Sequence, residues 1–248
     1  MNPSLYLRNI SVFGEISKGD YIRELPVVRH LQKAPLKLHS PVSFFVGENG
    51  VGKSTLIEAI AVSMGFNPEG GSRNFTFSTR KTHSDLADYL RIGKGGHPKD
   101  GFFLRAESFY NVATNIDEMD EAPGLGGFVI DSYGGVSLHE QSHGESFLAL
   151  VQNRFGGNGL YILDEPEAAL SPMRLLTLLC LIDDLVKKQS QFIISTHSPI
   201  LMSYPGAEVF EISENGIHAT PFRETEHYRI TKRFLDDLEG MLQRLLEP

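Results

Sequence analysis

The sequence predicts an α/β domain with a mostly parallel central sheet. Three segments, at 41–46, 160–163 and 191–195, are expected to be buried strands, and the second is a continuous apolar run, as in a strand that helices cover on both faces. Helical patterns follow the first two segments, at 53–64 and 172–188, and the second of these helices starts with proline. Strands that alternate with helices in this way favour parallel pairing.

Shorter segments complete the expected order of elements. The stretch 14–39 carries many charges and two prolines, so it is expected to be a hairpin or a loop excursion. The stretch 121–137 is rich in glycine and is expected to be mobile. Further strands are expected at 5–13 and 102–106, loops at 65–82 and 93–100, and helices at 84–90, 111–119 and 144–155.

The C-terminal part of the chain is expected to form a hairpin and then a helix. Strands at 208–212 and 216–220 flank Glu214-Asn215-Gly216, a sequence typical of a tight turn. Apolar side chains then recur along one stripe of the helix. They are Ile230, Phe234, Leu235, Leu238, Met241, Leu242, Leu245 and Leu246. The stripe is expected to pack on the domain, with a contact to a partner or a second copy as the alternative.

Composition fits one domain, because the 248 residues are 41% hydrophobic and can bury a sizeable core. No segment approaches the ~20 uninterrupted apolar residues of a membrane span. The first residues, Met1 to Ser4, do not resemble a secretory signal. The lone cysteine, Cys180, lies in an apolar helical run and is expected to be buried. A chain without internal disulfides fits the cytoplasm, which is the expected localisation.

Charge limits the expected partners. The net charge of −8 argues against nucleic-acid binding over the whole surface. Between Gly71 and Arg105, however, seven basic residues stand against three acidic ones. The basic residues are Arg73, Arg80, Lys81, Arg91, Lys94, Lys99 and Arg105. An ordinary solvated surface is the simpler interpretation, and a face for a phosphate backbone or an acidic partner is the alternative.

A glycine-rich segment between the strand expected at 41–46 and its helix points to nucleotide chemistry. Its residues are Gly47, Glu48, Asn49, Gly50, Val51, Gly52, Lys53, Ser54 and Thr55, which fit the phosphate-binding pattern G-x-x-x-x-G-K-[ST]. Glycines let the backbone wrap a polyphosphate, with N–H groups and a helix N-terminus aimed at the charge. Lys53 is expected to reach the β- and γ-phosphates, and the Ser54 hydroxyl is expected to bind Mg²⁺.

An apolar strand that ends in two acids supplies the second half of such a site. The run at 160–163 leads into Asp164 and Glu165, about a hundred residues after the glycine-rich loop. Asp164 is expected to hold the Mg²⁺ shell, and Glu165 to orient or deprotonate an attacking water. The pattern is weak alone and strong after a phosphate-binding loop.

Three further segments resemble those of the ATP-binding-cassette (ABC) ATPases. Ser142-His143-Gly144-Glu145-Ser146 resembles the LSGGQ signature in a degenerate form, in which Ser142 and Gly144 match and Glu145 departs from the consensus. The segment 164–172 resembles a Walker B motif that runs into a D-loop. The segment 195–199 resembles the switch segment, in which His197 would touch the γ-phosphate.

The resemblance implies a fold, a reaction and a partner. The fold would be a P-loop NTPase of ABC type, with a mostly parallel sheet, an N-terminal antiparallel β portion and a helical signature subdomain. The chain 1–248 would be one ATPase domain with its insert at about 65–155. The cofactors would be ATP and Mg²⁺, with Lys53, Glu165 and His197 catalytic. In this family the signature of one protomer completes the ATP site of the other. Ser142, Gly144 and Glu145 would therefore bind the partner's ATP in a head-to-tail homodimer.

Within the ABC ATPases, the chain is more similar to the soluble branch than to transporter subunits. That branch includes chromosome-maintenance heads, RecF-like proteins and lysogenization-defect nucleases. No glutamine lies between Lys53 and Gln141, where transporters carry their Q-loop residue. Glu107 is the candidate to take over its metal contact, with an exposed structural acid as the alternative. The chain has no room for a coiled-coil arm or a nuclease domain, so a bare ATPase head is expected.

Three functions remain open at this point. The first is a dimerising ATPase switch, with a role in DNA maintenance or phage defence and with nucleic acid or a partner protein as its target. The second is the ATPase subunit of a membrane transporter, which the missing Q-loop glutamine disfavours. The third is a non-catalytic, ATP-gated interaction module, which the presence of both Lys53 and Glu165 disfavours.

Overall fold

The computed structural model describes residues 5–17, 19–73, 84–106, 109–121 and 129–246. Its strands are β1 (Leu7–Val12), β2 (Leu36–Lys37), β3 (Val42–Gly47), β4 (Leu90–Lys94), β5 (Asp100–Arg105), β6 (Gly159–Asp164), β7 (Gln191–Ser195), β8 (Glu208–Ser213) and β9 (Gly216–Ala219). Its α-helices are α1 (Pro26–Lys33), α2 (Lys53–Ser63), α3 (Leu86–Tyr89), α4 (Phe109–Glu121), α5 (His143–Arg154), α6 (Pro172–Lys187), α7 (Pro199–Met202), α8 (Glu226–Asp236) and α9 (Leu238–Leu246). Short 3₁₀ helices include η1 (Tyr21–Glu24), η2 (Val129–Tyr133) and η4 (Pro166–Ala169).

The central sheet confirms the predicted fold class. Its strand order is β5-β6-β7-β3-β8-β9. The first five strands are parallel, and β9 returns antiparallel to β8 around the predicted turn. Every residue of β3, β6 and β7 is buried, as their largely apolar sequences predict for strands with both faces covered.

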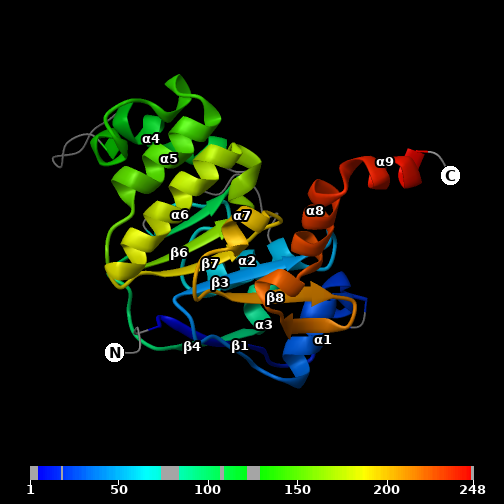
Figure 1. Ribbon diagram of the computed structural model, residues 1–248. Coiled ribbons are helices and arrows are strands. Elements are labelled where there is room, and N and C mark those ends of the chain that lie inside the picture. The colour runs from blue at the N-terminus through cyan, green and yellow to red at the C-terminus, as the bar shows by residue number, and fades with distance from the viewer. Residues whose placement is uncertain (1–4, 18, 74–83, 107–108, 122–128, 247–248) are drawn as a thin grey trace.

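A smaller antiparallel sheet, β2-β1-β4, forms the N-terminal β portion. Figure 1 shows it below the central sheet, with α2 and α3 between the two. Helices α4, α5, α6 and α7 lie across the opposite face of the central sheet. Neighbouring side chains of β3 point to opposite faces of the central sheet. Phe45 packs in the hydrophobic core that contains α2, and Phe44 packs in the core that contains α5 and α6.

The segment 14–39 differs from the predicted hairpin or loop, because it contains η1 and α1. Pro26 stands at the start of α1, where its missing N–H is harmless. Val27, Val28 and Leu31 form one buried face of the helix, which packs on β9 and β1. Arg29 and Lys33 are exposed on α1, and the other charged residues of the stretch lie outside this helix, so the charge pattern gave little sign of its buried face.

The region around residue 90 also differs from its prediction. The expected helix at 84–90 shortens to α3, and the expected loop after it begins as strand β4, paired with β1. Both β4 and β5 belong to sheets, so the segment 65–155, which the sequence predicted as an insert, contains strands as well as helices. Helix α7 was not predicted. The expected mobile stretch 121–137 contains η2, while residues 122–128 lie outside the described part.

The single C-terminal helix of the prediction is two helices, α8 and α9. They separate at Asp237, whose side chain accepts the N–H of Gly240 at 3.2 Å, as a helix N-cap does. The pair projects from the body of the molecule (Figure 1). The expectation that the apolar stripe packs on the domain is therefore wrong, because Leu235 is 72% exposed and Leu246 is 74% exposed.

Helix α6 corrects the expectation for Cys180, which is exposed. Leu175, Leu178, Ile182 and Leu185 form the buried stripe of this helix, and Cys180 lies on the opposite face. Among the described residues, no helix has the length and apolar character needed to cross a membrane.

Candidate functional site

The glycine-rich loop connects β3 to α2, as the sequence predicted. Gly47, Gly50 and Gly52 have φ angles of +141°, +85° and +98°, which residues with a side chain rarely adopt. A Cβ atom on Gly47 would lie 2.2 Å from the carbonyl oxygen of Ile212 on the neighbouring strand β8. The loop therefore needs glycine both for its backbone angles and for its close approach to β8. Its last glycine, Gly52, is the N-cap of α2.

Lys53 is folded over this loop. Its ammonium donates hydrogen bonds to the carbonyl oxygens of Gly47, at 2.8 Å, and Glu48, at 2.7 Å. The residue is only 5% exposed, and burial lowers the pKa of its ammonium, while the carboxylates of Glu165 and Asp164 oppose that shift. A cation held at the mouth of the loop and poorly solvated there gains from a bound polyanion.

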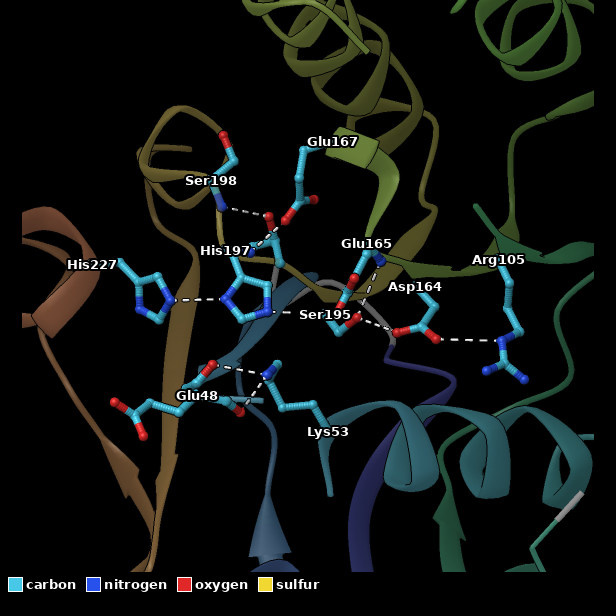
Figure 2. A network of polar contacts seen from close by, with 12 residues as sticks. Glu48, Lys53, Arg105, Asp164, Glu165, Glu167, Ser195, His197, Ser198 and His227 are labelled. Atoms are coloured by element: carbon cyan, nitrogen blue, oxygen red, sulfur yellow. Dashed lines mark hydrogen bonds and ion pairs between the residues drawn. The ribbon is translucent and has the colours of Figure 1, made fainter. Parts of the chain in front are cut away.

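Three side chains lie in a row across the carboxyl ends of neighbouring strands. The strand register pairs Arg105 of β5 with Asp164 of β6, and Asp164 with Ser195 of β7. The Ser195 hydroxyl donates to one carboxylate oxygen of Asp164, and Arg105 Nε lies 3.4 Å from the other. Arg105 also forms an ion pair with Glu58 of α2 at 2.7 Å. Asp164 is thus oriented from both sides (Figure 2).

The surroundings of Asp164 fit a hard divalent cation. Burial raises the pKa of this carboxyl, and hydrogen bonds from Ser195 and Ser54 together with the charge of Arg105 oppose the shift. Ser54 and Asp164 line one cavity of about 250 Å³. Their donor set is a hydroxyl and a carboxylate, and oxygen ligands of this kind suit Mg²⁺ that also binds phosphate. The described residues contain no cluster of three or more metal-ligating side chains.

Glu165 follows Asp164 in a left-handed backbone conformation, with φ 50° and ψ 53°. This conformation costs a residue with a side chain roughly 1–2 kcal/mol. The Glu165 N–H donates to the carbonyl oxygen of Ser195 at 3.1 Å, which holds the turn, and Pro166 starts η4 directly after it. The turn leaves the Glu165 carboxylate at the edge of the same cavity, where it is 37% exposed.

His197 lies beside Glu165, with its Nε2 at 3.5 Å from the Glu165 carboxylate. Its backbone N–H donates to the carboxylate of Glu167, which fixes the switch segment to η4. Its Nδ1 lies 2.9 Å from Nε2 of His227. Burial, together with the smaller effects of Lys53 and His227, lowers the pKa of His197 to about 4, so the ring is neutral at pH 7.

The signature-like segment forms the N-terminus of α5. Ser142 is the N-cap and exchanges capping-box hydrogen bonds with Glu145. Arg174 of α6 forms an ion pair with Glu145 at 3.1 Å. Gly144 is needed for packing, because a Cβ atom there would lie 2.9 Å from the carbonyl oxygen of Ala169. The hydrogen bonds that Ser142 donates to the Glu145 carboxylate lower its pKa, and the nearby Arg174 lowers that pKa by a smaller amount.

The structure brings most of the predicted site residues together, but not all. Lys53, Ser54, Asp164, Glu165 and His197 surround one region at the carboxyl ends of β3, β6 and β7 (Figure 2). Ser142, Gly144 and Glu145 contact η4 and α6 instead, and within the described residues no hydrogen bond or ion pair joins them to the phosphate-binding loop. Their neighbour His143 does line the cavity with Asp164 and Glu165. Glu107 lies outside the described residues.

Among the described basic residues of the segment 71–105, Arg73, Arg91, Lys94 and Lys99 are exposed, whereas Arg105 is partly buried. Arg105 is turned toward Asp164 and Glu58 in the site. The guanidinium carbon of Arg91 lies 3.4 Å from the centre of the Phe13 ring. Arg80 and Lys81 lie outside the described residues. A face for a phosphate backbone or an acidic partner therefore stays a prediction.

Several functional neighbours were missed from the sequence. Arg105 and Ser195 are the final residues of their strands, so the ends of parallel strands were a usable signal. Glu167 stands in the D-loop-like segment that the sequence already highlighted. His227 lies thirty residues after His197 with no local motif, and only the tertiary structure brings the two together.

Comparison with known proteins agrees with this geometry. Residues 64–203 match the family described as "AAA domain, putative AbiEii toxin, Type IV TA system". A search of curated proteins finds no match.

Among solved structures, "An inward-facing conformation of a putative metal-chelate type ABC transporter" is similar in fold. Its TM-score is 0.50 at 15% identity, over 93% of this chain and 88% of that chain. The "SMC head domain from Thermotoga maritima" has a TM-score of 0.45 at 17% identity, over 88% of this chain and 100% of that chain. Since the family match spans more than half of the chain, this protein belongs to that AAA-domain family, and it is a P-loop ATPase of ABC-type fold.

Proposed function

We propose that this chain binds ATP with Mg²⁺ and hydrolyses it, and that ATP joins two copies head to tail. One observation carries the proposal. Lys53, the pair Asp164 and Glu165, and His197 come from three separate segments and converge where β3, β6 and β7 end. In open α/β sheets, ligands bind at the carboxyl ends of the strands.

The phosphates would occupy the loop 47–55. Its backbone N–H groups and the N-terminus of α2 favour negative charge. Lys53 would exchange the carbonyl oxygens of Gly47 and Glu48 for phosphate oxygens. Because Lys53 is buried beside these two carbonyl groups, the exchange would replace neutral acceptors by charged ones and strengthen its hydrogen bonds.

The metal would be held by Ser54 and Asp164. When bound, Mg²⁺ would neutralise phosphate charge and stabilise the leaving oxygens. Ser195 and Arg105 hold the Asp164 carboxylate in one orientation. Arg105 also offsets part of the cost of keeping that carboxylate charged when no metal is bound. Glu107 is retained as a proposed additional ligand from the segment after β5.

Glu165 and His197 would act on the γ-phosphate and the attacking water. The Glu165 carboxylate reaches the cavity and can accept a proton from water that lies there. His197 is neutral at pH 7, so it would act as a hydrogen-bond donor to the phosphate rather than as a positive charge. Because His197 Nε2 lies 3.5 Å from the Glu165 carboxylate, a change in the charge of one side chain would change the electrostatic energy of the other.

The head-to-tail dimer would use the signature-like segment 142–146. Ser142 is exposed and the Glu145 side chain is 58% exposed, so a second copy could reach them. Their capping box and the ion pair to Arg174 would hold the N-terminus of α5 rigid for that contact. We propose that the chain 1–248 acts as one ATPase domain in this dimer.

The test is ATP turnover by the wild type and by two variants. Glu165→Gln should bind ATP and lose at least about 100-fold in kcat, because it lacks the base. Lys53→Ala should fail to bind ATP. The Glu165→Gln variant with ATP and Mg²⁺ should also migrate as a dimer in size-exclusion chromatography with light scattering. Wild-type protein that binds ATP without turnover would contradict the enzymatic part and favour an ATP-gated interaction module.

The biological setting is a separate proposal. We propose a role in phage defence or DNA maintenance, and the family description, which names a putative toxin of a type IV toxin–antitoxin system, favours the former. Affinity purification of Glu165→Gln with ATP and Mg²⁺ tests it. Nucleic acid or a non-membrane partner protein should co-purify. A membrane permease among the partners would instead favour the transporter subunit.

A further inference from the structure

A second histidine, His227 from α8, contacts the switch histidine. Its Nε2 lies 2.9 Å from Nδ1 of His197, and the two ring centres are 5.1 Å apart at an angle of 52° (Figure 2). The contact joins residues thirty positions apart, so it exists only because α8 returns to the site. Nothing in the phosphate-binding or signature motifs requires it.

The position of His227 is fixed by the start of its helix. Thr225 is fully buried and caps α8, where its hydroxyl oxygen accepts the N–H of Tyr228 at 3.4 Å. The same hydroxyl donates to the carbonyl oxygen of Phe222 at 2.8 Å. The N–H of Glu226 donates to the carboxylate of Glu211 on β8 at 3.0 Å. These bonds hold the first turn of α8, and with it the His227 ring, against the edge of the site.

Hydrogen-bond accounting selects one arrangement of protons on the two rings. If His197 donated from Nδ1, His227 would carry its own proton on Nδ1, because a neutral imidazole has one N–H. Among the described residues, that Nδ1 is buried and has no hydrogen-bond partner. The arrangement would bury an unpaired N–H, and it would leave His197 Nε2 as a bare acceptor facing the Glu165 carboxylate.

The opposite arrangement has neither fault. If His227 donates from Nε2 to Nδ1 of His197, its own Nδ1 is a bare lone pair, which tolerates burial better than an N–H. His197 then carries its proton on Nε2, where it faces Glu165 at 3.5 Å. Both rings are neutral at pH 7, since burial and the charge of Lys53 lower both pKa values. These lowered pKa values disfavour a protonated, cationic form of either ring, in which both ring nitrogens would carry an N–H.

We propose that His227 is a positioning residue of the nucleotide site. Its Nε2–H donates to Nδ1 of His197 and so keeps Nε2 of His197 protonated, as a donor aimed at Glu165 and at the γ-phosphate of bound ATP. This inference rests on the proposed function, because the γ-phosphate is the group that His197 would serve. It also joins the projecting helices α8 and α9 to the catalytic region through one hydrogen bond.

Two variants of similar volume test the donor. His227→Gln keeps an N–H that can reach His197, while His227→Met keeps the bulk and loses the donor. We expect His227→Met to lose about fivefold in kcat with KM for ATP nearly unchanged, which corresponds to about 1 kcal/mol of transition-state stabilisation. His227→Gln should recover most of the loss. Equal kcat values in both variants would overturn the inference.

A second readout does not depend on turnover. Two-bond ¹⁵N–¹H correlation spectra of the nucleotide-free protein report which ring nitrogen of His197 carries the proton, with His197→Gln used for assignment. The wild type and His227→Gln should show the proton on Nε2. A wild-type His197 protonated on Nδ1 would overturn the inference even if either variant failed to fold. Absent ATP turnover in the wild type would count against the proposed function alone, because these spectra would still decide the proton position.

Discussion

At the scale of single residues, the site depends on groups whose charge is set by their surroundings. Lys53 and Asp164 both lie inside the protein, and burial acts against the charged form of each. Partners reduce that penalty: Arg105 beside Asp164, and the two carboxylates of Asp164 and Glu165 beside Lys53. Keeping these buried groups charged costs folding free energy when no ligand is bound. The site therefore favours a ligand that brings both the negative charge of phosphate and the positive charge of a metal.

The lowered pKa of His197 predicts that folding stability depends on pH. Its pKa is about 4 in the folded protein and near 6.5 in the unfolded chain, so the unfolded chain binds more protons between those values. Folding stability should therefore fall as the pH drops from about 6.5 toward 4. The charged and titratable groups around the ring are Lys53, Glu165, Glu167 and His227, with Glu48, Glu211 and Glu226 around His227.

The measurement compares urea midpoints at pH 7 and pH 4.5 in the wild type and in His197→Asn. The wild type should lose more stability between the two pH values, by about 1 kcal/mol after allowing for the partial exposure of the ring. A pH dependence that is identical in the two proteins would mean that His197 is not held neutral by folding.

At the scale of elements, the N-terminus of α5 is fitted tightly against η4 and α6. A Cβ atom on Gly144 would lie 2.4 Å from Arg174 Nη1 and 2.9 Å from the carbonyl oxygen of Ala169. The Arg174 guanidinium can move away, but the movement would break its ion pair with Glu145. The carbonyl belongs to the backbone of η4, so its relief would need a shift of that segment.

Gly144→Ala should therefore destabilise the protein. Helix propensity alone would favour alanine by up to ~1 kcal/mol, whereas overpacking against backbone costs about 1–3 kcal/mol, so the net effect should be a loss. Gly96→Ala is the matched control, because its Cβ atom would meet only Tyr6 at 3.9 Å. Urea denaturation of the three proteins measures the difference. A Gly144→Ala protein as stable as the wild type would show that η4 yields easily.

Elements also show what the sequence could and could not predict. The strands β3, β6 and β7 were predictable because strands buried on both faces are largely apolar along their whole length. Helix α1 was not, since only Pro26, Val27, Val28 and Leu31 face inward and charged residues surround them. Strand β4 was missed because its sequence alternates weakly and contains Gly93, and its pairing with β1 depends on a distant segment. Likewise, Lys53 and Asp164 belong to local motifs, whereas His227 enters the site through tertiary structure alone.

At the scale of the whole molecule, Ser142 and Glu145 of the expected ATP site have no described hydrogen bond or ion pair to the phosphate-binding loop of their own chain, although their neighbour His143 lines the cavity with Asp164. The phosphate-binding loop and Asp164, Glu165 and His197 form one group, whereas Ser142 and Glu145 are exposed at the N-terminus of α5. A head-to-tail dimer explains this arrangement, because each ATP would then contact the loop of one copy and Ser142 of the other. In such a dimer, both composite sites are equivalent by symmetry.

Mixing two inactive variants tests that arrangement. One is Glu165→Gln, and the other is Ser142→Asp, which keeps the helix cap but places a negative charge toward the partner's phosphates. Ser142→Asn caps equally well without the charge, so it controls for structure and should stay more active. A mixed dimer has one site with both defects and one intact site, so an equal mixture should recover about a quarter of wild-type turnover if copies pair at random. If each chain formed its site alone, the mixture would show only the averaged residual activity of the two variants, and the head-to-tail dimer would be wrong.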